Sequence, residues 1–286
     1  MASNPTNSFV KTMFLTGLAL IAFAANSVLC RSALGQATID AASFTMIRLI
    51  SGITALWFIL LIRNGNKKQT LSGSWTAAAM LFLYAVAFSF AYISLETGTG
   101  ALILFAAVQL TMILIALFKG ERLGIIAWLG ILIAFSGFIY LILPGVSRPS
   151  FVGFLLMTIA GVAWGVYTIF GKGSARPLAD TTLNFTRTLP FMLVMTIFTF
   201  PFLELSIKGI VLAILSGAIA SGLGYTIWYT ALKGLSAAQA AVVQLLVPVI
   251  AATGGVVFIA EVITFRLVIS AVMILGGVTM VLKWQN

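Results

Sequence analysis

The stretch TGALILFAAVQLTMILIALF, residues 99–118, runs for twenty positions without a charged side chain. A bilayer's hydrocarbon core is ~30 Å thick, and a helix needs ~20 residues to cross it. Only helices and closed barrels satisfy their backbone hydrogen bonds there, and barrel strands alternate apolar with polar residues. Because this run is apolar throughout, it predicts a transmembrane helix.

The rest of the chain has the same character. Hydrophobic residues make up 61% of the 286 residues and charged residues 8%, and the mean hydropathy is +1.15. A soluble domain carries roughly 25% charged residues, so the composition indicates an integral membrane protein. The short connections leave no room for a soluble catalytic or regulatory domain. Ten spans are predicted, at residues 12–30, 41–62, 75–95, 99–118, 123–143, 151–171, 181–203, 210–232, 236–260 and 263–282.

The net charge of +10 reports membrane topology and not a nucleic-acid partner. If the amino terminus is cytoplasmic, ten basic residues fall on inner loops and ends and four on outer loops. Such an excess follows the positive-inside rule and places both termini in the cytoplasm. The inner ten are Lys11, Arg63, Lys67, Lys68, Lys119, Arg122, Lys172, Arg176, Lys233 and Lys283, and the outer four are Arg31, Arg148, Lys208 and Arg266.

Spans one to five resemble spans six to ten. Phe23 and Arg31 in the first half have the same spacing as Trp164 and Lys172 in the second. A half with five crossings must sit upside down relative to its copy, an arrangement typical of transporters with a midplane site. We therefore predict two domains, residues 1–148 and 149–286. The predicted fold is an all-α integral membrane bundle of ten helices, arranged as two inverted five-helix repeats around a central cavity.

Aromatic residues recur at helical spacing in spans three and eight. Tyr84, Phe88 and Tyr92 form one ladder, and Tyr225 and Tyr229 form the other. Residues four apart share a helix face, so each ladder presents one aromatic stripe. The stripes either line a substrate cavity or anchor the protein at the lipid headgroups, where Tyr and Trp gather. For Tyr92 and Tyr229, which lie near span ends, both interpretations stay open.

Depth in the membrane favours a cavity for the remaining aromatic residues. Tyr84, Trp164 and Tyr225 lie deep within their spans, where a Tyr or Trp side chain needs a hydrogen-bond partner. Tyr167 and Asn26 add polar groups at the same depth. These five residues, together with Phe88, Tyr92, Tyr229 and Gln244, are predicted to bind substrate.

Two amides lie inside spans four and nine, namely Gln109 and Gln244. A buried amide must be satisfied by a neighbouring helix or by a solvated cavity, and both interpretations apply here. Pro248 follows Gln244 by four residues, so it removes the hydrogen bond to the Gln244 carbonyl and predicts a helix break. The freed carbonyl, beside the Gln244 side chain, is a candidate acceptor for a substrate ammonium.

Arg48 and Arg187 are the two charged residues that lie deep inside predicted spans, each about two helical turns from the start of its helix. An intramembrane charge suggests function, with a substrate carboxylate as the obvious partner. The competing interpretation is structural: the two side chains snorkel or cap neighbouring carbonyls. We favour the structural interpretation.

The 5+5 repeat, together with several short motifs, resembles the drug/metabolite transporter superfamily and within it the EamA branch of bacterial exporters, most nearly the YddG-type amino-acid exporters. The resemblance covers nearly the whole chain. The first half of the chain departs from the pattern of the second half at two positions. Phe23 occupies the position of Trp164, and Val108 lies near the position that corresponds to Pro248. The matching motifs are Trp164-Gly165, Lys172, Tyr229, Pro248 and Gly120-Glu121-Arg122-Leu123.

The resemblance implies export of amino acids, aromatic or apolar ones preferred, and of related small metabolites by alternating access in the bacterial inner membrane. It implies no cofactor and no obligatory protein partner. A sugar-phosphate or nucleotide-sugar carrier of the same superfamily is the alternative substrate class. Such anions would need several basic cavity groups, and only the two intramembrane arginines are candidates.

Other function classes lack residues to support them. The chain has no histidine, one cysteine and no acidic residue within a predicted span. This excludes most nucleophilic and metal chemistry and argues against an enzyme. A channel or a structural membrane subunit is the alternative from another class. Proton-driven carriers relay through intramembrane Asp, Glu or His, so the sequence favours facilitated diffusion by a uniporter.

Overall fold

A computed structural model describes residues 5–64, 73–118, 120, 124–143, 149–171, 174–235 and 237–284. Lys172, three residues of the Gly120–Leu123 motif and the predicted boundary near residue 148 lie outside the described residues. So do five of the basic loop residues: Lys67, Lys68, Lys119, Arg122 and Arg148.

The first six predicted spans are continuous helices. Each begins and ends within a few residues of the predicted bounds, except at the amino terminus, where helix α1 starts earlier. The six are α1 (Pro5–Leu34), α2 (Ala41–Asn64), α3 (Trp75–Tyr92), α4 (Thr97–Phe118), α5 (Ile125–Ile142) and α6 (Phe151–Gly171).

The next three spans are each interrupted. Pro190 lies in the first turn of α8 and Pro248 in the first turn of α12, where a missing backbone N–H is tolerated but the preceding helix cannot continue. In the eighth span, a π-helical segment separates two α-helices. The elements are α7 (Pro177–Thr186), α8 (Leu189–Thr199), η1 (Phe200–Phe202), α9 (Ile207–Ile214), η2 (Leu215–Leu223), α10 (Gly224–Ala231), η3 (Leu232–Gly234), α11 (Ala237–Gln244), α12 (Val247–Ile259) and α13 (Phe265–Trp284).

The described residues confirm the predicted all-α integral membrane fold. They form no strand, and their one isolated β-bridge joins Ile39 to Leu205. Nine helical stretches in the described part of the chain are long and apolar enough to cross a bilayer, and the tenth apolar helix, Phe265–Val281, is shorter. Large apolar side chains point outward, such as Phe118 (90% exposed) and Phe258 (78%). Such a surface requires a lipid environment.

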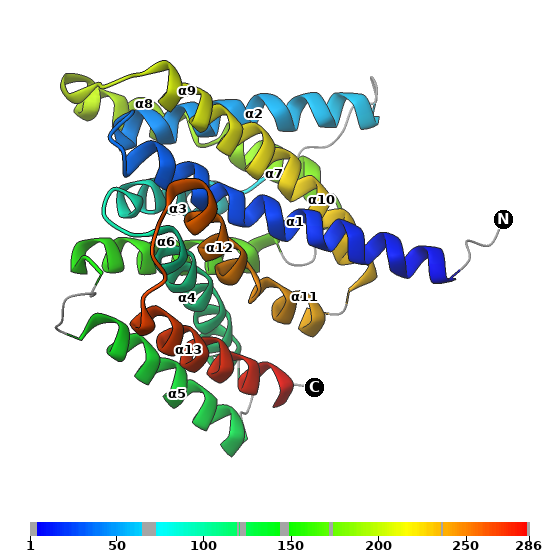
Figure 1. Ribbon diagram of the computed structural model, residues 1–286. Helices are drawn as coiled ribbons and strands as arrows, with labels where there is room; N and C mark the ends of the chain where they lie inside the picture. Colours follow the sequence, from blue (N-terminus) through cyan, green and yellow to red (C-terminus); the bar gives the residue numbers. More distant parts are fainter. Residues whose placement is uncertain are drawn as a thin grey trace.

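The packing of the helices pairs elements of the two halves (Figure 1). Helix α5 lies along α13, and α4 crosses α12. Helix α6 packs on α3 and α4, while α1 packs on α10 and α12. In the predicted repeat, α6 corresponds to α1, α3 to the eighth span and α4 to the ninth span. The contact of α6 with α3 then corresponds to that of α1 with α10, and the contact of α6 with α4 corresponds to that of α1 with α12. An inverted repeat requires this correspondence.

Glycine permits the closest of these crossings. A Cβ on Gly161 of α6 would lie 2.5 Å from the Ala107 Cβ of α4, and one on Gly277 of α13 would lie 2.4 Å from the Gly130 carbonyl oxygen of α5. Neither distance is possible for a real side chain. Small residues at these positions therefore bring the backbones together, as is usual between membrane helices.

Candidate functional site

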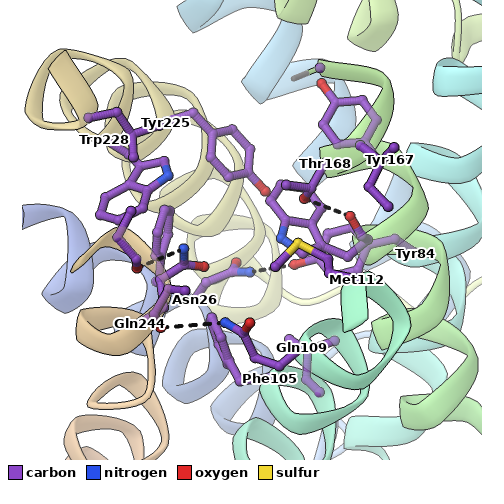
Figure 2. A pocket seen from close by; sticks show the side chains of 18 of the residues that line it. Asn26, Tyr84, Phe105, Gln109, Met112, Tyr167, Thr168, Tyr225, Trp228 and Gln244 are labelled. Atoms are coloured by element: carbon purple, nitrogen blue, oxygen red, sulfur yellow. Dashed lines mark hydrogen bonds between the residues drawn. The ribbon is translucent and has the colours of Figure 1, made fainter. Parts of the chain in front are cut away.

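A cavity of about 590 Å³ lies in the centre of the helix bundle. Its walls come from α1, α3, α4, α6, η2, α10, η3 and α11, so both halves of the chain contribute (Figure 2). The described residues that line it include no charged side chain. Eight residues predicted to bind substrate line it: Asn26, Tyr84, Phe88, Trp164, Tyr167, Tyr225, Tyr229 and Gln244.

Trp164 is the centre of the aromatic wall. Its ring lies 4.8 Å from that of Tyr84, 5.3 Å from that of Tyr167 and 5.1 Å from that of Tyr225, measured between centroids. Tyr167 and Tyr225 are stacked on it, whereas Tyr84 is tilted. Offset and tilted rings at these distances attract one another, which stabilises this arrangement of the wall.

A chain of hydrogen bonds orients the polar side of the cavity. Ser216 Oγ donates to Asn26 Oδ1 over 2.5 Å, and Asn26 Nδ2 donates to the Tyr84 hydroxyl oxygen over 3.4 Å. Figure 2 shows Asn26 and Tyr84 joined across the cavity. On α3 the ladder spacing places Phe88 beside Tyr84, with their ring centroids 5.4 Å apart.

The two predicted amides line the same cavity from facing helices, as Figure 2 shows. Gln244 Nε2 donates to the carbonyl of Ala240, and Gln109 Nε2 donates to the carbonyl of Ala241 over 3.5 Å. The Gln109 Oε1 atom is buried and accepts no hydrogen bond from the described residues. The amides therefore contribute both to helix packing and to the polar character of the wall.

Tyr92 is not brought to the cavity. It is fully buried, and its hydroxyl donates to the carbonyl of Thr97 over 3.3 Å, so neither the cavity nor the headgroup belt describes its environment. Helix α3 ends at this residue and α4 begins five residues later. The ladder therefore runs out of the cavity into the turn between the two helices.

Pro248 also lies apart from the central cavity. It borders a second, largely apolar groove lined by α4, α12 and α13. The helix is interrupted where this proline removes a backbone donor, between the end of α11 at Gln244 and the start of α12 at Val247.

Neither arginine lines the cavity, and neither donates a side-chain hydrogen bond to a backbone carbonyl among the described residues. Arg48 is 2% exposed, and its Nη2 donates to the Tyr84 hydroxyl over 3.1 Å. Arg187 lies over the ring of Trp75 with its Cζ 5.5 Å from the centroid. Each of the two guanidinium groups keeps one buried nitrogen, Nη1, without a hydrogen-bond partner among the described residues.

Several lining residues were absent from the predicted set. Phe23 faces Trp228, with ring centroids 5.7 Å apart. The repeat could have located Phe23, because its counterpart in the second half is Trp164. Phe105 and Met112 share one face of α4 with Gln109, a relation that helical spacing from the predicted amide would have given.

The cavity is closed at one end. Arg31 Nε lies 3.2 Å from Glu261 Oε1, and Arg31 Nη1 donates to the carbonyls of Tyr92 and Ile93 over 3.1 and 3.0 Å. The Thr97 backbone N–H donates to both Glu261 oxygens, the nearer at 2.9 Å. These contacts tie α1 to the α3–α4 turn and to the segment between α12 and α13. We call the Arg31–Glu261 pair and these backbone contacts the latch.

The other end of the cavity reaches the ends of several helices. Ala116 in the last turn of α4, Gly171 at the end of α6 and Leu232 after α10 line it there. The latch lies at the opposite end of α4, beside Thr97. The site is therefore a pocket that extends from mid-bundle toward one side of the membrane and is sealed toward the other.

Half-buried Glu96 adjoins the latch. Partial burial raises the pKa of its carboxyl, the negative charge of Glu261 raises it further, and Arg31 opposes the rise. A carboxyl with a raised pKa takes up a proton more readily than an exposed one, and the charges of both latch side chains act on the Glu96 carboxyl.

Comparison with known proteins identifies similarity to membrane transporters. The model of a family described as EamA-like transporters matches residues 151–283. An uncharacterized protein of Pseudomonas aeruginosa is 48% identical over 95% of this chain and 94% of its own length. An uncharacterized transporter of Archaeoglobus fulgidus is 28% identical over 70% of this chain and 73% of its own. A solved crystal structure with 18% identity superposes with a TM-score of 0.59 over 92% of this chain and 95% of that chain, which shows a shared fold.

Proposed function

Since this chain belongs to the EamA-like transporter family, we propose that its cavity carries amino acids, aromatic or apolar ones preferred, out of the bacterial cell. The observation that carries this proposal is the uncharged cavity walled by the Trp164 ring group and two amides. Its volume of about 590 Å³ lies within the range of small-molecule sites, ~300–1,000 Å³. Aromatic rings supply contact area for an apolar side chain, and their faces attract an ammonium.

The proposed mechanism is alternating access through two inverted halves, residues 1–148 and 149–286. The exchange of contacts between α3–α6 and α1–α10, and between α4–α6 and α1–α12, supports it. Of the helices in these contacts, α1, α3, α4, α6 and α10 also form cavity walls, and the ninth span contributes through α11. Exchanging the conformations of the halves would then open the latch end and close the other.

The proposed orientation places both termini in the cytoplasm, and it rests on the excess of basic residues at that side. In this orientation the open end of the cavity faces the cytoplasm, where an exporter loads its substrate. Lys233 follows the open end and Lys208 lies beside the latch end, and both are exposed. No charged group lines the cavity among the described residues, so we propose facilitated diffusion, with the cell's own metabolite pool as the driving force.

The same uncharged lining disfavours a carrier of sugar phosphates. A dianionic phosphate needs several basic groups, because a single hydrogen bond cannot replace its hydration. Arg48 touches the cavity only through Tyr84, and Arg187 lies outside it. Sugar phosphates are therefore expected to compete weakly.

The test is counterflow in proteoliposomes with purified protein and a panel of aromatic, apolar and charged amino acids beside sugar phosphates. Saturable counterflow of aromatic amino acids is expected for the wild type. Trp164→Ala should lower apparent affinity roughly tenfold or more, because it removes one large desolvated contact. Phe198→Ala is the matched control, since Phe198 is 74% exposed on the lipid side.

A result in which phosphates compete better than amino acids would contradict the proposed substrate class. A flux that does not saturate would contradict a carrier and favour a channel. Net accumulation that disappears when an imposed proton or sodium gradient is collapsed would contradict facilitated diffusion.

A further inference from the structure

Arg48 is a buried charge without a counter-charge. It is 2% exposed, and no carboxylate lies within ion-pair distance of it among the described residues. Its Cζ lies 4.8 Å from the centroid of Phe88 and 5.3 Å from that of Tyr84, so cation–π attraction offsets part of its lost hydration. One terminal nitrogen, Nη1, still has no acceptor. An anion near this residue would stabilise it.

Tyr84 connects this charge to the cavity. Its hydroxyl oxygen accepts one hydrogen bond from Arg48 Nη2 at 3.1 Å and one from Asn26 Nδ2 at 3.4 Å. Ser216 in turn holds the Asn26 carbonyl oxygen, which leaves the Asn26 amide nitrogen directed at Tyr84. A phenol oxygen has two lone pairs, and both are now engaged. Because the Tyr84 oxygen accepts both of these hydrogen bonds, the hydrogen of its hydroxyl is left to donate to another group.

The hydrogen of Tyr84 has no acceptor among the described residues, whereas the residue itself lines the cavity (Figure 2). Two donors pull electron density from the phenol oxygen, one of them cationic, and this makes the hydroxyl a stronger donor. In a wall without charged groups, such a donor is the natural position for an anion.

A hydrogen-bond acceptor for a positively charged group lies on a facing helix, α4. Gln109 on α4 lines the cavity, and its buried Oε1 atom accepts no hydrogen bond from the described residues. This oxygen is therefore an unused acceptor. The aromatic rings packed around Trp164 line the same cavity. A donor backed by a cation and a free acceptor suit the carboxylate and the ammonium of a zwitterion.

We propose that the Tyr84 hydroxyl binds the α-carboxylate of the substrate, with Arg48 behind it as a positioning residue that supplies positive charge, and that Gln109 Oε1 accepts the α-ammonium. This subsite rests on the proposed function, and it deepens that function by making the α-amino acid group, and not only the apolar side chain, the recognised feature. Arg48 need not enter the cavity, because its charge acts through one hydrogen bond.

The experiment compares phenylalanine with phenethylamine, which lacks the carboxylate, and with 3-phenylpropionate, which lacks the ammonium. Each competes for counterflow of labelled phenylalanine in proteoliposomes. Tyr84→Phe deletes only the hydroxyl and should weaken phenylalanine and 3-phenylpropionate by roughly ten- to a hundredfold, the loss expected for one charge-assisted hydrogen bond. Phenethylamine should be unaffected. Gln109→Leu should show the reverse pattern, weakening phenylalanine and phenethylamine.

Tyr140→Phe is the matched control, because Tyr140 is outside the cavity, on α5, and it should change none of the three. Arg48→Met should reproduce the Tyr84→Phe pattern. If that variant does not fold, as judged by its elution profile in detergent, the Tyr84→Phe comparison alone decides. An unchanged ratio of 3-phenylpropionate to phenethylamine affinity in Tyr84→Phe would overturn the subsite.

The outcomes separate the subsite from the proposed function. If the wild type carries phenylalanine and phenethylamine equally well, amino-acid transport stands and the subsite fails. If labelled phenylalanine does not move, direct binding of 3-phenylpropionate is measured by quenching of tryptophan fluorescence. Binding that depends on the Tyr84 hydroxyl would then support the subsite while amino-acid transport fails, and no binding would overturn both.

Discussion

Glu261→Gln should open the latch end of the cavity. The substitution keeps the shape of the side chain and one acceptor oxygen for the Thr97 N–H, but it removes the charge that Arg31 contacts at 3.2 Å. The two side chains are 21% and 12% exposed, so the pair is screened only in part. Arg31 keeps its hydrogen bonds to the carbonyls of Tyr92 and Ile93, and the site should remain folded.

The magnitude follows from this geometry. Coulomb's law at 3.2 Å with an effective dielectric constant of ~20 bounds the attraction at about 5 kcal/mol, before the cost of desolvation. Measured hydrogen bonds to charged groups contribute about 1.5–3 kcal/mol. We therefore expect a loss of about 2 kcal/mol from the closed state, which is roughly a thirtyfold shift in the equilibrium between closed and open latch.

The assay is cysteine labelling from the latch side in right-side-out vesicles, with Ser27→Cys in a Cys30→Ser background. Ser27 lines the cavity and lies one helical turn before Arg31, so an impermeant thiol reagent reaches it from that side only when the latch is open. Labelling should accelerate roughly thirtyfold in Glu261→Gln. Glu204→Gln is the matched control, an exposed acid outside the latch. Equal labelling rates in the wild type and Glu261→Gln would refute the reasoning.

Three further predictions concern proton linkage, packing and orientation. The pKa of Glu96 is raised in the closed state, so the closed state binds a proton more tightly than a state in which this carboxyl is exposed. Lowering the pH from that raised pKa toward the ordinary carboxyl value should therefore favour the closed latch and slow the labelling of Ser27→Cys. Glu96→Gln should abolish this pH dependence. Gly161→Ala should lower the melting temperature measured in detergent, since its Cβ would overlap Ala107 across a helix crossing at a cost of about 1–3 kcal/mol, whereas Gly17→Ala, with open space around it, should not. In intact cells, an impermeant reagent should label Lys208→Cys but not Lys233→Cys in the Cys30→Ser background, and the reverse pattern would invert the proposed orientation.

Composition and local periodicity determined the class of the protein and most of the cavity wall. A run such as residues 99–118 has no alternative to a spanning helix, because an unpaired backbone group in hydrocarbon costs several kcal/mol. Helical geometry also determined that Tyr84 and Phe88 share a face, and depth within the span indicated that Trp164 and Tyr225 face the interior. These are properties of one helix and its solvent, and neither needs knowledge of a neighbour.

The tertiary structure decided whatever depends on where two helices meet. It carried Tyr92 into a helix turn and placed Arg48 behind Tyr84. It also joined Arg31 to Glu261 across 230 positions of sequence. Periodicity assigns a side chain to a face, but the partner on that face depends on the crossing point and depth of another helix. Those are set by close approaches such as Gly161 against Ala107. The latch and the Tyr84 hydrogen-bond chain are therefore properties of the packed bundle, because each joins side chains from different helices.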